Sequence, residues 1–593
     1  MRRRIKFILI IFSIFGIILI SRLYFLSIKS NAYYERLALE NITKTEYYTA
    51  PRGEIRDTNG EPLAINKLGF SLSLKPHLKK NEVDFALSFI SKHLPDFSIE
   101  KIKNIYTRSN SPYNHKDIKI INFIPYDDLI SKFVLFKSQN RFIISPSSKR
   151  FYPQGEMMAH ILGYVAKADK KDEDRSKITK LIGVSGKTGI EKQYNLQLQG
   201  TLGEKEKKVT ALNKTLRTIK DKKPTSSNLK LTVDIKVQEF IKELFTDLSG
   251  AIIVMDAKDG SILAAGSYPE YDNNDFVNGI TQEDWQTMIK DLNHPFTNKF
   301  LHGLYPPGSS TKPLVLLSYL NSNLITADEK LLCEGEISLG KRKFRCWNQF
   351  GHGEVDAKRA IKESCDVYFY KGGLRVGIDK ISTDLSRYEF GKKTGVDLPS
   401  EFIGTVPSRN WKIEKFGEGW HKGETLNTVI GQGDFLVTPL QVATATALVA
   451  TGELITPHFI KSIDELNITY KSSDILTTIE KQNLHYIQEG MYEVCNKKGG
   501  TAYKYNSSKI TIAGKTGTSQ VVGIPQDEIK RMSEDDLKYF KKSHAWFSTY
   551  APYKKPQFIV TAIIEHGGHG GSAAGEIVSK VYNYLLELGY IRD

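Results

Sequence analysis

The hydrophobic pattern opens with an apolar stretch at the N-terminus. Residues 7–20 are predominantly aliphatic or aromatic, and apolar residues continue past Arg22 to Ile28. A membrane-spanning helix usually needs about 20 apolar residues, so a cleaved signal peptide is an alternative to an anchor. No small-x-small cleavage site closes the segment, and Arg22 can reach the membrane interface, which favours an uncleaved anchor. Arg2 to Arg4 then stay inside, and the chain after residue 28 lies outside the cytoplasmic membrane.

Further along the chain, short apolar runs alternate with turn residues. Residues 250–256 and 260–264 flank a Lys-Asp-Gly turn and are rich in aliphatic side chains, which predicts a β-hairpin. Residues 510–513 form a similar short β-type run. Residues 313–317 are a continuous apolar run behind a Pro-Pro-Gly breaker, and they predict a buried helix. The second half of the chain is therefore expected to contain both strands and helices.

Length and composition set outer bounds on the architecture. The chain has 593 residues, of which 40% are hydrophobic, so it should hold two or more domains with their own cores. A formal net charge of +16 could indicate a nucleic-acid or anionic-membrane partner. The lysines are scattered among Ile, Asn and Tyr, however, and no nucleic-acid motif is present. A general compositional bias explains the charge better.

The segment 305–312 carries the strongest chemical signal. Ser309 and Lys312 lie three residues apart behind the Pro-Pro-Gly breaker, so they should share one face of the first helical turn. The Lys312 amine is then expected within hydrogen-bonding reach of the Ser309 hydroxyl. Burial and a neighbouring cation can lower the pKa of a lysine until it accepts a serine proton. The pair predicts an activated nucleophile, although a lone Ser-x-x-Lys is more often a solvated helix surface.

Two further motifs follow the serine in order. Residues 364–366 read Ser-Cys-Asp, and residues 515–518 read Lys-Thr-Gly-Thr directly after the strand-like run. Ser-x-x-Lys, a Ser-x-polar triplet and Lys-Thr-Gly in this order are typical of penicillin-binding proteins and related β-lactamases. Residues 187–189 also read Lys-Thr-Gly, but they precede the serine. We interpret this earlier copy as coincidence.

Four cysteines raise a separate question. Cys333, Cys346 and Cys365 share one region with His352, and Cys495 stands apart. In an oxidising compartment, a disulfide between the first two is one interpretation, and unrelated buried thiols are another. The region lacks a Cys-x-x-Cys pair, which weakens a metal site on pattern alone. Three thiolates and an imidazole would nevertheless complete a closed tetrahedral zinc site of the structural kind.

Several further segments match the boxes of a known family. They are residues 50–60, 150–153, 159–165, 189–192, 198–200, 431–433, 438–441, 544–547 and 551–552. With the three motifs above, the chain resembles a class B penicillin-binding protein over nearly its whole length. The boxes of the first 200 residues indicate class B, and the His-Ala-Trp-Phe box at 544–547 resembles the elongation subgroup of rod-shaped bacteria.

This resemblance implies an α+β multidomain fold. Residues 1–28 would form a cytoplasmic tip and transmembrane anchor, and residues 29–228 an extended, mostly β pedestal of the dimerisation type. Residues 67–148 would form a separable head within the pedestal. Residues 229–593 would form the transpeptidase domain, an antiparallel sheet flanked by helices, with the Lys-Thr-Gly strand at one edge of the catalytic cleft.

The resemblance also implies a reaction, the cross-linking of peptidoglycan stem peptides with release of D-alanine. Ser309 would attack the carbonyl between two terminal D-alanines, with Lys312 as base, and a neighbouring stem amine would take the acyl group. Ser364 with Lys515 would relay a proton to the departing D-alanine. The backbone N–H groups of Ser309 and Thr518 would stabilise the oxyanion. β-Lactams would trap the same serine, and a D-Ala-D-Ala carboxypeptidase side activity is compatible with this chemistry.

The remaining motif residues receive roles in the same way. Thr516, Gly517 and Thr518 would bind the substrate carboxylate. Asp366 stands where many relatives have Asn. Related elongation enzymes also have Asp there, so we expect an active enzyme and leave the role of Asp366 open.

The resemblance implies a structural zinc ion and no organic cofactor. Some elongation-type members carry zinc near the active site, with a His and a Cys where His352 and Cys365 fall. Those members have carboxylates where this chain has Cys333 and Cys346, and zinc accepts thiolates equally well. The metal would then hold Cys365 and so position Ser364.

The expected setting is the bacterial cytoplasmic membrane, with a single span and the bulk of the chain extracytoplasmic. The implied partners are peptidoglycan stem peptides, a RodA-type glycan polymerase and MreC-like elongation proteins, without nucleic acid. A division-type transpeptidase is an alternative with other partners. A non-catalytic scaffold should have lost Ser309, Lys312 or Lys515, and a β-lactam sensor would need further membrane segments or a cytoplasmic effector.

Overall fold

The computed structural model describes residues 2–30, 33, 36, 42–209, 215–521 and 537–592. The chain forms two compact units. The first comprises residues 1–52, 169–183 and 199–227, and the second comprises residues 53–168, 184–198 and 228–593. The domain boundaries given above follow the family boxes and stay a prediction.

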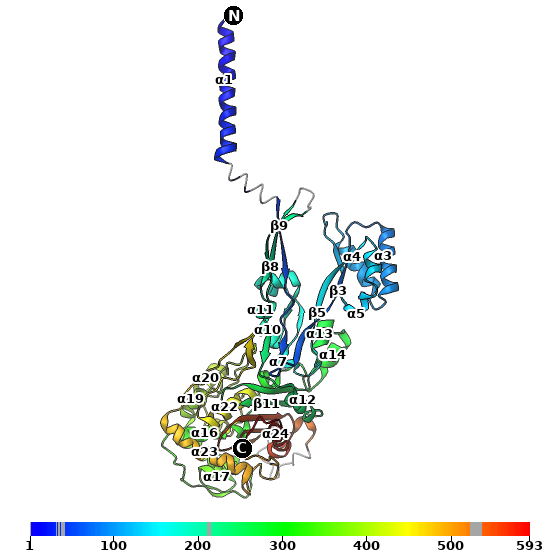
Figure 1. Ribbon diagram of the computed structural model, residues 1–593. Helices are drawn as coiled ribbons and strands as arrows, with labels where there is room; N and C mark the ends of the chain where they lie inside the picture. Colours follow the sequence, from blue (N-terminus) through cyan, green and yellow to red (C-terminus); the bar gives the residue numbers. More distant parts are fainter. Residues whose placement is uncertain are drawn as a thin grey trace. The chain divides into compact units, whose positions relative to one another are not determined.

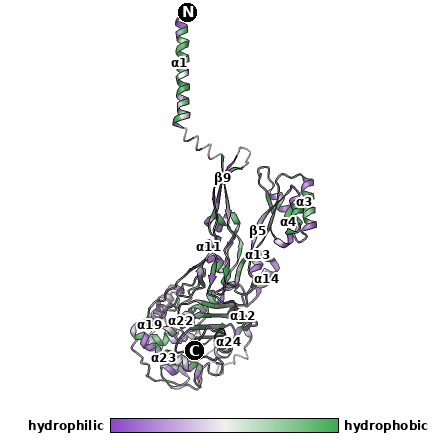
Figure 2. Cartoon of the chain, in the orientation of Figure 1, coloured by the Kyte–Doolittle hydropathy of each residue, from purple (hydrophilic) through white to green (hydrophobic). Residues whose placement is uncertain are grey.

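The first unit begins with a long apolar helix, α1 (Arg2–Tyr24), which continues into a π-helical turn, η1 (Phe25–Lys29) (Figures 1 and 2). No residue of α1 is buried, although most of them are hydrophobic. A helix that is hydrophobic all round belongs in an apolar environment. The segment is long and apolar enough to cross a membrane. The predicted anchor is therefore a helix with the length and character of a single-pass span.

A three-stranded antiparallel sheet of order β1-β8-β9 completes the first unit together with two short helices. These elements are β1 (Thr43–Thr49), β8 (Leu202–Val209), β9 (Thr215–Lys222), α8 (Lys170–Arg175) and α9 (Lys177–Ile182). Charged side chains pair across the strands, as in the 2.5 Å contact between Lys207 and Glu46. Such exposed pairs contribute about 0–1 kcal/mol each, so they favour the strand register more than they stabilise the sheet.

In the second unit, the long strand β3 (Pro62–Leu74) organises the N-terminal part (Figure 1). It pairs with β2 (Ile55–Arg56), β4 (Ile118–Pro125) and β5 (Phe142–Phe151), and the sheet continues through β10 (Leu229–Leu231), β17 (Ile460–Ile463) and β18 (Leu466–Asn467). Helices α3 (Lys80–His93), α4 (Ile99–Ser109), α5 (Tyr126–Ile130) and α6 (Phe133–Lys137) enclose a hydrophobic core with Leu72, Ile90 and Phe136. All residues of this core lie within the predicted head, residues 67–148.

A buried ion pair joins two of the segments that matched the family boxes. Arg150, at the end of β5, donates to Glu191 at 2.6 Å and to the Gly53 carbonyl at 2.8 Å. Both charged side chains are almost inaccessible, and removing one partner of such a pair costs about 3–5 kcal/mol. Glu191 lies in α10 (Gly189–Gln193). The earlier Lys-Thr-Gly copy, residues 187–189, stands at the start of this helix, and its Thr188 is the N-cap residue. That copy therefore begins a helix and lies on no strand edge.

The C-terminal part of the second unit is built on a five-stranded antiparallel sheet of order β12-β11-β21-β20-β19. Its strands are β11 (Gly250–Asp256), β12 (Ile262–Tyr268), β19 (Ala513–Ser519), β20 (His544–Ala551) and β21 (Phe558–Ile564). Nearly every strand residue is buried because helices cover the sheet. Helix α12 (Ile235–Leu244) contacts α24 (Gly570–Glu587), and α15 (Lys299–His302) contacts α22 (Pro439–Thr451). The predicted hairpin is confirmed as β11 and β12, and the Lys-Thr-Gly motif lies on the edge strand β19.

Helix α16 (Lys312–Leu320), which follows the nucleophile segment, contacts four further helices: α17 (Ala357–Lys362), α18 (Asp366–Val376), α19 (Ile378–Arg387) and α23 (Thr478–Asn496). Every residue of α16 is buried, which confirms the predicted buried helix. The other short elements are α7 (Ala159–Leu162), β6 (Val165–Lys167), β7 (Val184–Gly186), α11 (Asn195–Gln199), α13 (Asn273–Asn278), α14 (Gln282–Lys290), β13 (Leu331–Cys333), β14 (Glu336–Leu339), β15 (Arg342–Arg345), β16 (Gly353–Val355), α20 (Arg409–Phe416), α21 (Lys422–Val429) and η4 (Tyr539–Lys541).

Candidate active site

Ser309 lies in a tight turn that is held against strand β19. The turn is a 3-10 helix, η2 (Gly308–Thr311), where the sequence predicts the first turn of an α-helix; the α-helix α16 begins at Lys312. Gly308 has φ +55, and a Cβ there would lie 2.8 Å from the Thr518 carbonyl oxygen. Its N–H donates to the Gly431 carbonyl at 2.8 Å. The missing side chain at Gly308 thus lets the nucleophile segment approach the Lys-Thr-Gly motif closely.

The Lys312 amine connects two of the three motifs. Its side chain is completely buried, and it donates to the Ser364 carbonyl at 2.9 Å, the Ser364 hydroxyl at 3.2 Å and Asp366 Oδ1 at 2.7 Å. Within the described residues these are the hydrogen bonds of this amine, so the expected bond to Ser309 is absent. A carboxylate is the stronger acceptor for an ammonium group, which explains why the amine turns toward Asp366.

Asp366 uses both of its carboxylate oxygens. Oδ1 accepts from Lys312, and Oδ2 accepts from the backbone N–H of Trp347 at 2.9 Å. An asparagine offers only one acceptor oxygen, and its NH₂ group would face one of these two donors. Asp366 is also the first residue of α18, where the helix dipole favours a negative charge. The contacts of this position therefore suit aspartate better than the asparagine that many relatives have.

Ser364 itself adopts an uncommon backbone conformation. Its φ is +53, in the left-handed region that non-glycine residues rarely occupy. Such a conformation costs about 1–3 kcal/mol and persists only where the surroundings impose it. The following N-cap residue of α18, Cys365, is completely buried. The strained turn presents the Ser364 hydroxyl to Lys312.

Lys515 is the second buried lysine of the site. Burial, together with the neighbouring positive charge of Lys312, lowers the pKa of Lys515 well below its usual range. Its amine donates to the Thr516 carbonyl at 3.0 Å. A lysine of this kind can be neutral and can accept a proton.

Gly517 and Thr518 lie where strand β19 passes the nucleophile turn. A Cβ at Gly517 would lie 3.0 Å from the Pro307 carbonyl oxygen. The Thr518 carbonyl accepts from the Gln432 amide at 3.1 Å, and the N–H of Gly570, the first residue of α24, lies 3.5 Å from the Thr518 hydroxyl. The structure thus brings the serine turn, the Ser-Cys-Asp triplet and the Lys-Thr-Gly strand to one place.

The four predicted metal ligands form one cluster. One ligand atom from each of Cys333, Cys346, His352 and Cys365 lies within 4.8 Å of the others. His352 Nδ1 is 3.6 Å from the Cys333 sulfur and 3.5 Å from the Cys346 sulfur, and the four cysteines of the chain are free thiols. Hydrogen bonds from Cys365 and His352 lower the pKa of Cys346 to about 3 and that of Cys333 to about 6.

This donor set fits zinc. Three sulfurs and one imidazole nitrogen make a complete tetrahedral set, and the two lowered pKa values favour the thiolate forms that bind the metal. Cys495 lies outside the cluster, as the sequence suggested. The cluster touches the active site through the chain, because Cys346 precedes Trp347 and Cys365 precedes Asp366.

Sequence reasoning missed two sets of residues around the site. A buried network behind the nucleophile runs from Lys299 through Glu565 to Tyr305, with contacts of 2.6 and 2.7 Å to the carboxylate. Thr501 hydrogen-bonds the hydroxyl of Thr516 at 2.7 Å. No motif or periodicity marks Lys299, Glu565 or Thr501, since their partners are distant in sequence.

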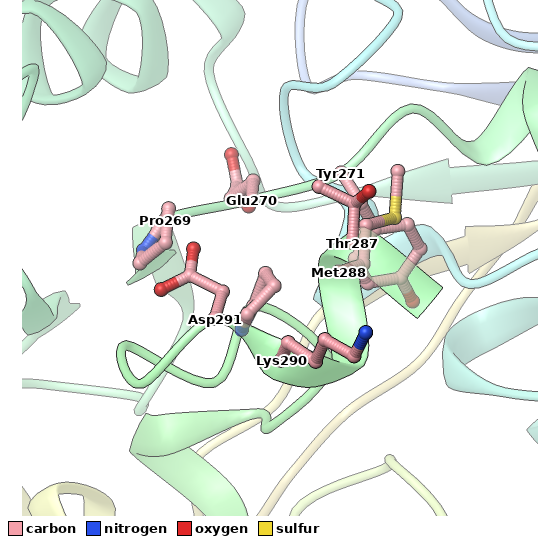
Figure 3. Close-up of a pocket in the computed structure, with 8 residues that line it drawn as sticks. Pro269, Glu270, Tyr271, Thr287, Met288, Lys290 and Asp291 are labelled. Carbon is pink, nitrogen blue, oxygen red and sulfur yellow. The ribbon is translucent and has the colours of Figure 1, made fainter. Parts of the chain in front are cut away.

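A separate cavity of about 530 Å³ lies elsewhere in the second unit (Figure 3). Its lining consists of Pro269, Glu270, Tyr271, Thr287, Met288, Lys290, Asp291 and Pro295. None of the predicted site residues lines it, so it is not the candidate active site.

Comparisons with known proteins agree with this geometry. Residues 250–583 match the model of the penicillin binding protein transpeptidase domain, and residues 47–231 match the penicillin-binding protein dimerisation domain. The chain belongs to the class B penicillin-binding proteins, in which these two domains are combined. The predicted α+β fold, with an antiparallel sheet in its transpeptidase domain, is thereby confirmed.

The more specific similarity is to the penicillin-binding protein 2 group. The peptidoglycan D,D-transpeptidase MrdA of Haemophilus influenzae is 34% identical over 96% of this chain and 89% of that protein. Helicobacter pylori penicillin-binding protein 2, solved in a complex with MreC, is 43% identical with a TM-score of 0.86 over 93% of this chain and 100% of that one. A chain of a solved peptidoglycan synthase complex is 25% identical with a TM-score of 0.70 over 98% of this chain and 97% of that one.

Proposed function

We propose that this protein is a peptidoglycan D,D-transpeptidase of the elongation type, with Ser309 as nucleophile. The observation that carries the proposal is the contact of Lys312 with both Ser364 and Asp366, next to a serine turn that lies against the Lys-Thr-Gly strand. Three motifs that are far apart in sequence converge there. The similarity to MrdA proteins supports the elongation role.

In the proposed reaction, the Ser309 oxygen attacks the carbonyl carbon between the two terminal D-alanines of a stem peptide. The hydroxyl proton is proposed to pass to the amine of Lys312, which contacts the Ser364 hydroxyl. Ser364 together with Lys515, whose lowered pKa allows a neutral amine, would relay a proton to the departing D-alanine. The backbone N–H groups of Ser309 and Thr518 are proposed to stabilise the oxyanion. The carbon–nitrogen bond then breaks, and D-alanine leaves with the proton. A stem-peptide amine takes the acyl group and restores the serine.

The substrate carboxylate is proposed to bind along the exposed side of β19. Thr516 and Thr518 would donate hydroxyl hydrogens to it, and the missing side chain of Gly517 lets the nucleophile turn lie close to this strand. A β-lactam carries a comparable carboxylate and would acylate the same serine.

We also propose that Cys333, Cys346, His352 and Cys365 hold a structural zinc ion. When bound, zinc would supply no proton or electron to the reaction and would tie together the chain segments before Trp347 and Asp366. The experiment is elemental analysis of the full-length protein purified without chelator. About one zinc per chain is expected, and a metal-free protein that is fully folded would contradict the zinc proposal.

The topology and the partners belong to the same proposal. The α1 helix would anchor the chain in the cytoplasmic membrane, with the chain after residue 28 outside the cytoplasm. The similar Helicobacter pylori protein was solved with MreC, and another similar chain belongs to a peptidoglycan synthase complex. We therefore propose an MreC-like protein and a RodA-type glycan polymerase as partners.

The decisive test is covalent labelling of the full-length protein in detergent. A fluorescent penicillin should label the protein, peptide mass spectrometry should place the label on Ser309, and Ser309→Ala should abolish it. A folded protein that takes no label would favour the non-catalytic scaffold. Co-purification with a RodA-type polymerase, compared with a division-type polymerase, distinguishes the elongation enzyme from a division-type transpeptidase.

A further inference from the structure

Thr501 lies outside all motifs and still contacts the proposed carboxylate-binding residues. Its hydroxyl oxygen is 2.7 Å from the hydroxyl oxygen of Thr516. In the described part of the chain, neither hydroxyl has another hydrogen-bonding partner. Thr516 is only 7% exposed, so solvent offers its hydroxyl few alternatives. The direction of the Thr516 hydroxyl hydrogen therefore depends largely on Thr501.

The backbone around Thr501 is fixed from several sides. A Cβ at Gly500 would lie 2.3 Å from the Glu493 carbonyl oxygen, so the loop packs tightly on the end of α23. Ala502 is completely buried and donates its N–H to the Val494 carbonyl at 3.1 Å. A Cβ at Gly571 in α24 would lie 2.6 Å from the Thr501 carbonyl oxygen. These contacts leave little freedom for the loop to move Thr501 away from Thr516.

Two hydroxyl groups in contact share one hydrogen between their oxygens. If Thr516 donates to Thr501, its own hydrogen is used and only lone pairs remain for a bound anion. If Thr501 donates, the Thr516 hydrogen is free to point at the substrate carboxylate, and the bond between the hydroxyls strengthens that donation. A carboxylate in the site selects the second arrangement, in which the bond donated by Thr501 holds the Thr516 hydroxyl and strengthens its donation to the anion.

We infer that Thr501 is a positioning residue that orients the Thr516 hydroxyl toward the carboxylate of the stem peptide or of a β-lactam. The inference rests on the proposed function, since it takes Thr516 as a carboxylate-binding residue. Valine has the shape of threonine without the hydroxyl, and serine keeps the hydroxyl. Thr501→Val and Thr501→Ser therefore separate the hydrogen bond from the packing.

The test measures acylation of the full-length protein by a fluorescent penicillin and separates the binding constant from the acylation rate at saturation. Thr501→Val should weaken binding about ten-fold and leave the saturated rate nearly unchanged, because one hydrogen bond in a buried site is lost. Thr501→Ser should behave like the unmutated protein. In a Thr516→Val background, Thr501→Val should have no further effect. The same penicillin amidated at its carboxylate should not distinguish Thr501→Val from the unmutated protein.

Three results would overturn the inference. The first is a Thr501→Val variant that equals the unmutated protein, the second is a loss that persists in the Thr516→Val background, and the third is the same loss with the amidated penicillin. Melting temperatures of all variants identify a folding defect. If Thr501→Val is destabilised, Thr501→Ser supplies the comparison with the unmutated protein. A hydroxyl with a purely structural role would affect the two penicillins equally. If the unmutated protein takes no label on Ser309, the proposed function is contradicted, and the inference that rests on it fails as well.

Discussion

The Cys-His cluster and the catalytic centre meet at Ser364-Cys365-Asp366, but the chain builds them differently. All four cluster ligands fall within residues 333–365, and local backbone bonds hold them. The His352 N–H donates to the Cys333 carbonyl at 3.1 Å, and the Cys346 N–H donates to the Gly335 carbonyl at 2.7 Å. The catalytic centre instead joins the distant segments around residues 309, 364 and 515. A local cluster can therefore fix one component of a centre that is otherwise assembled from remote parts.

The two regions also differ in charge. The cluster contains two thiols, those of Cys346 and Cys333, whose pKa values are lowered by hydrogen bonds from Cys365 and His352, and it suits a cation. The catalytic centre contains the two buried lysines Lys312 and Lys515, with Asp366 in contact with only the first. One carboxylate cannot neutralise two ammonium groups, so the centre favours a neutral Lys515. The cluster is suited to binding a cation, and the centre is suited to moving a proton.

The largest effect is expected at Lys515. Lys515→Arg should reduce acylation by about two to four powers of ten, because a guanidinium group stays charged and cannot accept a proton. In the unmutated protein the acylation rate should rise with pH through a pKa that lies below the usual lysine value of about 10.4. The measurement is the rate of fluorescent-penicillin labelling across pH, with Lys509→Arg, an exposed lysine, as control. A rising limb that survives in Lys515→Arg would assign the titration to another group.

The contribution of Lys515 to the stability of the fold should also increase with pH, as the acylation rate does. The unfolded chain binds a proton on Lys515 at pH values where the folded chain does not. The contribution of Lys515 to the free energy of unfolding therefore rises with pH between its lowered folded pKa and about 10.4, and it is lost as pH falls through the folded pKa. Denaturant unfolding of the unmutated protein and of Lys515→Met at several pH values measures this difference.

The next largest effect tests the dependence of the centre on the cluster. Cys346→Ser should lose the zinc, lower the melting temperature and reduce acylation about ten- to a hundred-fold, since the segments before Trp347 and Asp366 are no longer tied. Elemental analysis and labelling rates are measured on the same preparation. Cys495→Ser is the matched control, because this buried cysteine lies outside the cluster and should retain the metal. Equal zinc content in both variants would contradict the ligand assignment.

A smaller effect is expected from Asp366→Asn, which should keep the zinc and reduce acylation about ten-fold or more. The amide loses one of the two bonds that the carboxylate makes to Lys312 and to the Trp347 N–H. Loss of a hydrogen bond to a charged group costs about 1.5–3 kcal/mol. Asp379→Asn is the control, because Asp379 occupies the first turn of the next helix and is exposed. Full activity of Asp366→Asn would show that one acceptor is enough.

Much of the fold could be predicted because its signals are local. The apolar N-terminal segment, the hairpin of β11 and β12 and the buried helix α16 each follow from a short run of residues. The three catalytic motifs could be found because their residue types and order are specific. The ligand set of the cluster came from a resemblance, and the structure brings the same four residues together.

The remaining features depend on contacts that sequence spacing does not encode. The spacing of Ser309 and Lys312 predicted a bond between them, but a distant carboxylate competes for the amine. The lowered pKa of Lys515 follows from its burial, which is a property of the folded chain and not of the sequence spacing. The contacts of Thr501 and of the Trp347 N–H with the site can be recognised only in the folded structure, because Thr501 is a loop residue outside the motifs and the Trp347 N–H is a backbone group.

The smallest expected effect comes from Trp347→Phe, which separates the backbone of this residue from its side chain. The indole N–H donates to the Glu363 carbonyl at 2.9 Å, and the side chain is 54% exposed, so water can replace this bond. The backbone N–H that Asp366 accepts is retained in phenylalanine. Acylation should therefore fall by a factor of about three or less, with zinc unchanged. A loss as large as that of Asp366→Asn would mean that the indole, and not the bond to Asp366, holds the cluster against the catalytic centre.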